Sequence, residues 1–135
     1  MLGDLIGQES GQTTGQRVVA GEHGLAPTVE TSFVGSGTLL GVEVNDMGTY
    51  SARLRADGTL HGEGQGILMS PSGASATWQG AGVGTITESG GNSWRGSLIF
   101  TSDSPEFAAL RGAVGVFEWE VDASGKAEGK FWAWK

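Results

Sequence analysis

Acidic, basic and hydrogen-bonding side chains gather on two neighbouring segments in the middle of the chain. If residues 56–58 (Ala-Asp-Gly) form a hairpin loop, Arg53 faces His61, and Glu63 follows two residues later. A guanidinium, an imidazole and a carboxyl group in one confined space would shift each other's pKa and could transfer protons. Tyr50 is the only tyrosine and could donate a hydrogen bond from a pocket wall. We therefore take Tyr50, Glu63 and His61 as candidate catalytic residues.

The same hairpin register predicts a set of ligand-binding residues. Continued across the next hairpin, it places Gln65 opposite Gln79 and Gly66 opposite Trp78. Two surfaces result. One is a polar stripe, made of Thr49, Arg53, His61, Glu63, Gln65 and Gln79. The other is a glycine face flanked by aromatic rings. The candidate ligand-binding residues are Tyr50, Arg53, Glu63, Gln65, Trp78 and Gln79.

Only one of these two surfaces can point into a protein interior, because successive side chains of a strand point to opposite faces. A polar stripe on an antiparallel sheet commonly faces solvent. Aromatic rings commonly cover strand glycines as a packing device, whereas glycines can also make room for a ligand, here between Tyr50 and Trp78. The residues alone do not decide which surface points inward or which role the glycines have. Asp46 and Glu43, near the Gly48 bend, are further candidate acids.

Glycine spacing indicates the elements that must position these residues. The chain of 135 residues contains 25 glycines, many at every second position, as in Gly62-Glu63-Gly64-Gln65-Gly66. Period two is the side-chain period of a strand, so such glycines share one face of a sheet. Glycine within strands is found where a sheet bends tightly or another group packs against the backbone. The pattern predicts a small, strongly curved and closed β-sheet.

Turn residues divide the chain into eight strands joined mostly by short hairpins. A first strand ends at about residues 16–20. The others are expected at residues 28–40, 42–54, 59–70, 75–88, 93–101, 113–121 and 127–134. Ser104, Pro105 and Gly112 predict one short helical turn near residues 104–110. No helix is long enough for a parallel crossover. We expect an all-β fold with one domain over residues 1–135, an eight-stranded antiparallel up-and-down (meander) barrel; a β-sandwich is the alternative.

Composition excludes several classes of partner. The net charge of −7 and eight scattered Lys and Arg residues argue against nucleic acid and anionic membranes. The chain has no cysteine, so a catalytic thiol and a thiolate metal site are excluded. His23 and His61 have no ligand cluster in the sequence, so we expect no metal and no cofactor. The N-terminus has no basic region followed by an apolar stretch, so we expect a bacterial-type cytoplasmic location.

The last hairpin predicts an aromatic core and an exposed aromatic face. With residues 123–125 as its loop, Phe117 faces Phe131 and Val116 meets Trp132. Phe117, Trp119 and Phe131 are then core residues. Trp132 and Trp134 lie on the opposite face, where they could cover the closing seam of the barrel or form a subunit interface. A homo-oligomer, a dimer or a trimer, is therefore one expectation.

Strand and glycine patterns recur over most of the chain in a form known from other barrels. They lie at residues 29–37 (VETSFVGSG), 57–66 (DGTLHGEGQG), 82–84 (GVG), 94–96 (WRG) and 110–118 (LRGAVGVFE). In these segments the chain resembles small uncharacterised bacterial proteins with the allene-oxide-cyclase-like barrel. The resemblance implies an eight-stranded barrel, often oligomeric, whose cavity in some relatives binds or cyclises an apolar substrate. It carries over no catalytic motif.

Three functions are compatible with these observations. The first is binding of a small apolar ligand in an apolar, aromatic cavity, because barrels hold ligands in their interiors and mouths. The second is an enzyme of cyclase or isomerase type that uses Tyr50, Glu63 and His61. The third is a structural or self-association module without a ligand, which uses the exposed tryptophans.

Overall fold

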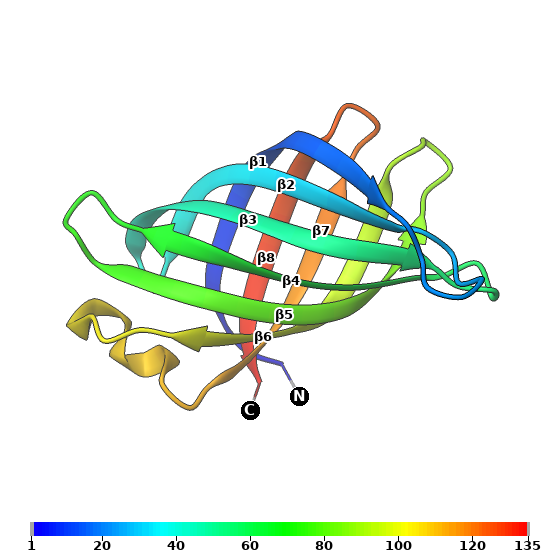
Figure 1. The fold of residues 1–135 in the computed structure, drawn as a ribbon. Helices are drawn as coiled ribbons and strands as arrows, with labels where there is room; N and C mark the ends of the chain where they lie inside the picture. Colours follow the sequence, from blue (N-terminus) through cyan, green and yellow to red (C-terminus); the bar gives the residue numbers. More distant parts are fainter. Residues whose placement is uncertain (1, 135) are drawn as a thin grey trace.

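The chain folds into a closed barrel of eight antiparallel strands in the computed structural model, which describes residues 2–134 (Figure 1). The strands follow one another around the barrel in chain order, and the first pairs with the last. They are β1 (Leu2–Val19), β2 (Thr28–Leu39), β3 (Val42–Leu54), β4 (Leu60–Met69), β5 (Ser75–Ile86), β6 (Asn92–Thr101), β7 (Val114–Val121) and β8 (Lys126–Trp134). The predicted meander barrel is confirmed. The alternative of a sandwich is wrong, because the β1–β8 pairing closes the sheet on itself.

Hairpin loops set the register as predicted. In the β3–β4 loop the Arg55 N–H donates to the Thr59 carbonyl (2.7 Å), and Gly58 has a φ of 85°, which favours glycine. Asp57 Oδ1 accepts from the Thr59 N–H (3.0 Å) and fixes the turn. Arg53 therefore pairs with His61, as expected. The predicted β4–β5 and β7–β8 registers are confirmed in the same way.

The first strand is much longer than the sequence indicated. The sequence predicted only its end, at residues 16–20, but β1 runs over 18 residues and pairs with both β2 and β8. Its apolar alternation is weak because the buried positions are Gly7 and Glu9 rather than large apolar residues. A register shift between Thr13 and Gly15 bends the strand further.

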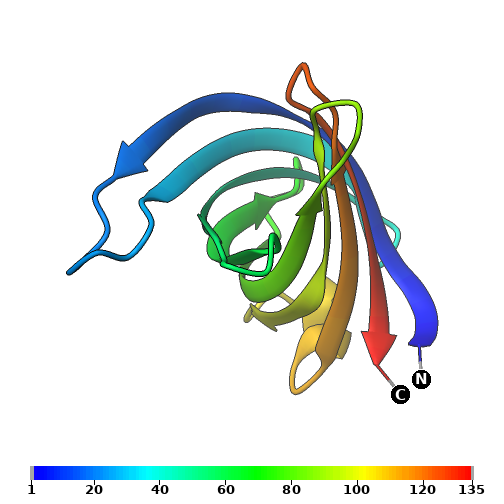
Figure 2. The same cartoon turned by 90° about the vertical axis from the view of Figure 1, so that its right-hand side faces the viewer.

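The two ends of the barrel differ. At one end the short 3-10 helix η1 (Pro105–Leu110) closes the barrel, with Phe107 0% and Leu110 2% exposed. The predicted helical turn is thus confirmed, although the Ser104 hydroxyl accepts from the Ser75 N–H (3.0 Å) and does not cap the helix. At the other end the β1–β2 hairpin extends sideways beyond the other strands (Figure 2). No helix in residues 2–134 is long and apolar enough to cross a membrane.

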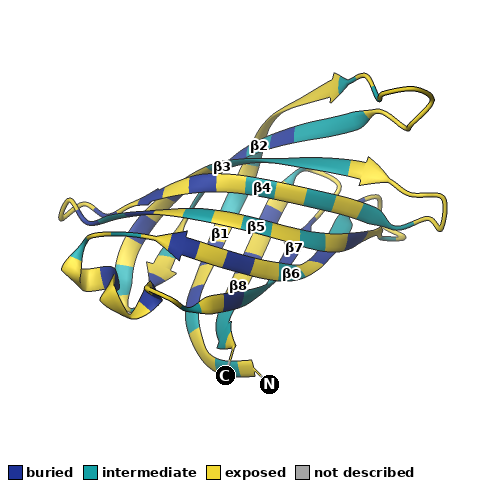
Figure 3. Cartoon of the chain, turned by 60° about the horizontal axis from the view of Figure 1, so that its bottom comes forward, coloured by how far each residue is buried: buried dark blue, intermediate teal, exposed yellow. Residues whose placement is uncertain are grey.

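Buried and exposed residues alternate along the strands, so one set of side chains points into the barrel and the other points outward (Figure 3). Two apolar clusters fill the interior. The cluster near η1 includes Leu39, Leu68, Leu98, Phe100, Phe107 and Leu110. The second lies nearer the opposite end and contains Phe33, Trp94, Trp119, Val121 and Ala127. Partly buried Trp78 and Phe117 pack against both clusters, so the core is continuous along the barrel.

Candidate functional site

The glycine face points inward, and the polar stripe points outward. Tyr50 and Trp78 line the interior together with Gly62, Gly64 and Gly80. On the polar stripe Thr49 is half-buried, and the exposed residues are Arg53, His61, Glu63, Gln65 and Gln79. The sequence left this choice open, and the structure decides it through strand alternation.

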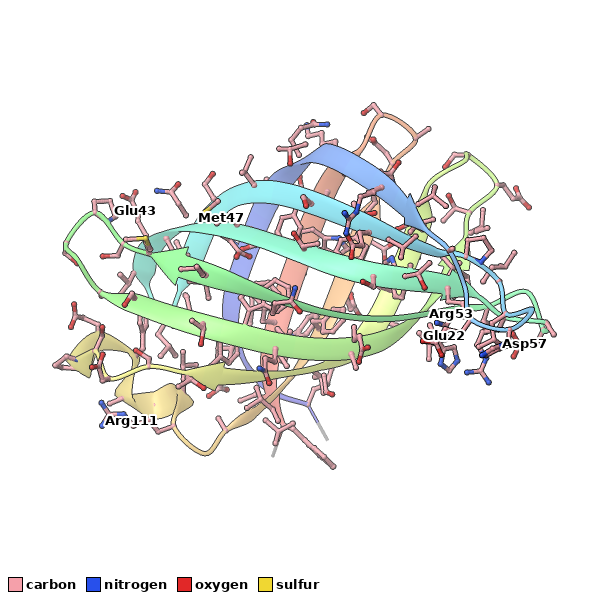
Figure 4. All side chains as sticks on the ribbon, in the orientation of Figure 1. Glu22, Glu43, Met47, Arg53, Asp57 and Arg111 are labelled. Atoms are coloured by element: carbon pink, nitrogen blue, oxygen red, sulfur yellow. The ribbon has the colours of Figure 1, made fainter. Side chains whose placement is uncertain are left out.

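The three candidate catalytic residues are therefore not brought together. Tyr50 lies inside the barrel, whereas the side chains of His61 and Glu63 lie outside, because even and odd positions of paired β3 and β4 face opposite ways. On the outside, Arg55 Nη1 lies 3.2 Å from His61 Nδ1. Figure 4 labels Arg53, at the barrel end that carries the Asp57 loop.

The outer residues make local polar contacts. Arg53 Nη2 donates to Thr28 Oγ1 (3.4 Å), and Gln65 Nε2 donates to the Thr49 carbonyl (3.1 Å). Together with His61 and Glu63, Arg53 lines a hollow on the outer side of β3–β5. Of the six candidate ligand-binding residues, only Tyr50 and Trp78 point their side chains into the interior.

The glycines of the inner face lie beneath the indole rings. A Cβ built on Gly48 would come within 2.6 Å of Trp78 Cζ2, and one on Gly62 within 2.8 Å of Trp94 Cη2. A Cβ on Gly129 would likewise meet Trp119 Cε3 at 2.6 Å. Of the two interpretations of the glycines, the structure shows the packing device: they make room for large rings on a narrow barrel.

Five of these inner rings contact one another and form an aromatic cluster. Phe33 is at its centre, with ring centroids 4.8 Å from Trp119, 6.2 Å from Tyr50 and 6.2 Å from Trp78. Tyr50 contacts Trp94 edge-on at 5.9 Å. Such edge and offset arrangements are favourable beyond simple burial. The cluster leaves a cavity of about 80 Å³ in the interior.

Two carboxyl groups are buried against this cavity, Glu9 from β1 and Asp46 from β3. They are 4% and 5% exposed. Asp46 Oδ1 accepts a hydrogen bond from Trp78 Nε1 (2.9 Å). Both carboxyl oxygens of Glu9 are buried, and apart from the side chain of Asp46 no group is placed to hydrogen-bond to them. Buried carboxyl groups are usually paired or hydrogen-bonded, so Glu9 is an unusual residue.

The environment keeps Glu9 protonated at neutral pH. Burial, followed by the negative charge and side-chain contact of Asp46, raises the pKa of Glu9 from 4.5 to about 10. Burial also raises the pKa of Asp46, while Glu9 and the Trp78 N–H favour its ionised form. The pair thus holds a proton at a pH at which an exposed carboxyl has none. This makes Glu9 a possible hydrogen-bond or proton donor toward the cavity.

A second polar group lies among the rings. Burial raises the pKa of the Tyr50 hydroxyl, whereas nearby Trp119 and Thr31 lower it. Thr31 is 5% exposed, and its hydroxyl accepts from Gln16 Nε2 (3.1 Å). Trp119 Nε1 is buried beside the Tyr50 hydroxyl. The interior therefore contains polar groups of Glu9, Tyr50 and Trp119 among its apolar side chains.

Glu9 was missed by the sequence analysis, although a signal existed. In the run Gly7-Gln8-Glu9-Ser10-Gly11, glycines lie two residues before and two residues after Glu9. Glu9 therefore belongs to the glycine face, which points inward. Asp46 was named as a candidate acid and is buried, whereas Glu43, named with it, is exposed and projects outward (Figure 4). No group of three or more His, Asp or Glu within residues 2–134 is placed to hold a metal.

The aromatic residues of the last hairpin divide as expected. Trp119 is buried, and Phe117 and Phe131 pack against the core clusters. On the outer face Trp132 is half-buried and Trp134 is 62% exposed. Self-association through this face stays a prediction.

Comparisons with known proteins identify the fold. No protein-family model and no curated protein sequence matches the chain. A protein of unknown function from Clostridium acetobutylicum has a TM-score of 0.83 at 12% identity, over 98% of both chains. A β-barrel-like protein from Acinetobacter baumannii has a TM-score of 0.79 at 10% identity, over 98% of this chain and 96% of that one.

A third similar structure is described as an enzyme and comes from Penicillium herquei. Its TM-score is 0.64 at 12% identity, over 98% of this chain and 96% of that one. At such identities the likeness of all three proteins shows the fold alone. The chain thus has the architecture of a set of small β-barrel proteins, two of them bacterial.

Proposed function

We propose that the barrel interior binds a small molecule with an apolar body and one polar group. The observation that carries this proposal is the carboxyl group of Glu9 in an otherwise apolar interior: both of its oxygens are buried, and apart from Asp46 no group is placed to hydrogen-bond to them. Each such atom costs about 1–3 kcal/mol when left unsatisfied. A ligand that supplies partners would recover this cost.

The size of the cavity limits the ligand. About 80 Å³ is well below the 300–1,000 Å³ that is usual for ligand pockets. Since a cavity of about 150 Å³ holds benzene, the space as it stands admits only a molecule of a few non-hydrogen atoms. A larger ligand requires the rings of the aromatic cluster to move apart, which is easier at the end away from η1 because Phe107 and Leu110 close the other end.

The experiment that tests this function is a tryptophan fluorescence titration with a chemically varied set of small apolar molecules. Trp78, Trp94 and Trp119 line the cavity, so binding should change the emission saturably. Native mass spectrometry of the purified protein, followed by denaturing extraction, checks for a molecule acquired during expression. Absence of a saturable response across the whole set, with no extracted molecule, would overturn the proposal.

An enzyme of cyclase or isomerase type is the second candidate. The observation in its favour is a buried carboxyl group, Glu9, that keeps its proton at neutral pH and borders an apolar cavity, as a general acid requires. The resemblance to allene-oxide-cyclase-like barrels favours this reaction class, and the Penicillium herquei protein is described as an enzyme. Glu9 takes the role that the sequence analysis gave to Glu63.

The second candidate has a distinct test, because cyclisation and isomerisation leave the mass of the substrate unchanged. The protein is incubated with a bacterial small-molecule extract, which is then analysed by chromatography and mass spectrometry. The wild-type protein should convert a compound into an isomer of equal mass, and Glu9→Gln should not. Conversion that persists in Glu9→Gln would exclude Glu9 as the acid, and no conversion at all would argue for binding alone.

A further inference from the structure

We propose that the ligand of the barrel is an organic cation, a protonated amine whose ammonium group binds to the carboxyl groups of Glu9 and Asp46. This inference rests on the proposed ligand-binding function and names the chemical class of the ligand.

The two buried carboxyl groups have no cationic partner in the protein. Glu9 and Asp46 are the only buried charged residues in the described part of the chain. Every Lys, Arg and His of residues 2–134 is exposed, so none of them can neutralise the pair. Buried carboxylates are stable only when they are paired, coordinated or protonated. The positive charge must therefore come from a proton or from a ligand.

The free hydrogen-bonding positions of the pair match an ammonium group. Apart from the contact with Asp46, neither oxygen of Glu9 has a partner, and Asp46 has one further partner in Trp78. An ammonium group has three N–H donors and no acceptor. It can donate to both carboxyl groups at once, which neither a hydroxyl nor a carbonyl can do. A carboxylate ligand would instead add a second negative charge next to the Glu9–Asp46 pair.

The rings around the cavity suit a cation that carries an apolar body. Phe33, Tyr50, Trp78, Trp94 and Trp119 all border the cavity. The electron-rich faces of Trp, Tyr and Phe attract cations, by about 2 kcal/mol when the cation is desolvated. Such rings also bury the apolar part of an amine. Carboxyl groups and aromatic faces thus favour the same class of ligand.

Proton release should accompany binding of the amine. Without ligand, burial and Asp46 keep Glu9 protonated, since its pKa is raised to about 10. No other titratable group acts on it within residues 2–134: β2 and β8 present Gly37 and Gly129 beside it. An ammonium group lowers that pKa and displaces the proton. Affinity should therefore rise with pH as long as the amine stays charged, below about pH 10.

The experiment compares three probes with the same four-carbon chain: n-butylamine, 1-butanol and butyrate. The first is a cation, the second is neutral and the third is an anion, and all three have the same short apolar body. Calorimetric titrations are made with the wild-type protein, with Glu9→Gln, and with Glu43→Gln as the control. Glu43 is an exposed glutamate on the outer face of β3, so this variant makes the same substitution outside the cavity.

The wild-type protein should bind n-butylamine about tenfold or more tightly than 1-butanol, and butyrate least. Glu9→Gln should lower the affinity for n-butylamine by about tenfold or more and change the affinity for 1-butanol by less than about twofold. Glu43→Gln should change neither of these two affinities. Titration of the amine in buffers of different ionisation enthalpy should show proton release, which a merely structural role of Glu9 would not produce.

The possible failures are distinguishable. If 1-butanol or butyrate binds as tightly as n-butylamine, the proposal that the ligand is a cation is wrong, while the proposed ligand-binding function stands. If the amine binds equally well to Glu9→Gln, the proposed position of the ammonium group is wrong. If none of the three probes binds and the wider fluorescence titration is also negative, the ligand-binding function itself fails. Thermal melting of Glu9→Gln confirms that the variant is folded.

Discussion

Glu9 of β1 and Asp46 of β3 come together inside the barrel although β2 runs between their strands. Glu9 pairs with Gly37 of β2, and Asp46 pairs with Gly35. Neither glycine has a side chain to separate the two carboxyl groups. A Cβ built on Gly35 would lie 3.5 Å from Glu9 Oε1, so the carboxyl group lies over the bare backbone of β2. This arrangement creates the polar part of the cavity.

The buried Glu9 should make the barrel less stable as the pH rises. Its pKa is about 10 in the folded protein and near 4.5 when exposed, so between these values folding takes up a proton. The free energy of unfolding should then fall with pH, by up to about 1.4 kcal/mol per pH unit for one proton. Denaturant titrations between pH 5 and 9 measure this slope.

Glu9→Gln should flatten that slope and stabilise the protein at high pH, because glutamine has no proton to gain. Asp46 contributes in the same direction, since its pKa is also raised. Glu43→Gln serves as the control and should keep the wild-type slope. A slope that is identical in Glu9→Gln and the wild-type protein would show that Glu9 does not hold a proton in the folded state.

Gly37→Ala should destabilise the barrel, because its Cβ would overlap the Gln8 carbonyl and approach Glu9 Cα at 2.6 Å. A backbone clash of this kind costs about 1–3 kcal/mol. Gly15→Ala is the matched control: Gly15 lies on β1 with no atom within 4 Å of a built Cβ, and its φ is not positive. That variant should be neutral or gain up to about 1 kcal/mol. Equal stabilities in chemical denaturation would refute the role given to Gly37.

Phe107→Ala should test the closure of the barrel by η1. Phe107 is fully buried among Leu39, Leu68 and Phe100 in the same apolar cluster. Its truncation should cost about 3–5 kcal/mol. Glu106→Ala, an exposed neighbour on the same helix, should change the free energy of unfolding by less than about 0.5 kcal/mol. A small loss in Phe107→Ala would mean that η1 does not contribute to the core.

Tyr50→Phe and Glu63→Gln distinguish the inner site from the site expected on the polar stripe. Tyr50 borders the cavity and its hydroxyl lies near Trp119, so Tyr50→Phe should change the affinity for n-butylamine. The side chain of Glu63 lies outside, so Glu63→Gln should leave that affinity within about twofold. A large loss in Glu63→Gln alone would support the outer site instead. Calorimetry gives both affinities.

The barrel was predictable because local signals set it. Turn residues such as Asp57 and Gly58 determined the register, and every strand after β1 lies within two residues of its predicted ends. Which face of the sheet points into the barrel was not predictable in the same way. Glycines, unlike leucines or valines, do not mark a face as buried, because they add no apolar area of their own. The polar stripe and the glycine face were therefore equally eligible for the interior.

The candidate site was only half predictable for a related reason. Tyr50 and Trp78 were recognised because aromatic residues among glycines indicate close packing. Glu9 was missed because a single glutamate in a weakly apolar segment has the pattern of a solvated residue. Its contact with Asp46 depends on the β1–β2 register, which no short hairpin fixes: the loop between them spans residues 20–27. Long-range pairing of this kind is set by the closed barrel as a whole.

The most direct test of an interior binding site is ¹⁹F NMR of the protein labelled with 5-fluorotryptophan, titrated with n-butylamine. Each of the five tryptophans gives its own resonance, assigned by Trp→Phe variants. Trp78, Trp94 and Trp119 border the cavity, whereas Trp132 and Trp134 lie on the outer face. Binding inside the barrel predicts saturable shifts of the first three resonances only. Shifts confined to Trp132 and Trp134, or no saturable shift, would contradict binding of the amine inside the barrel.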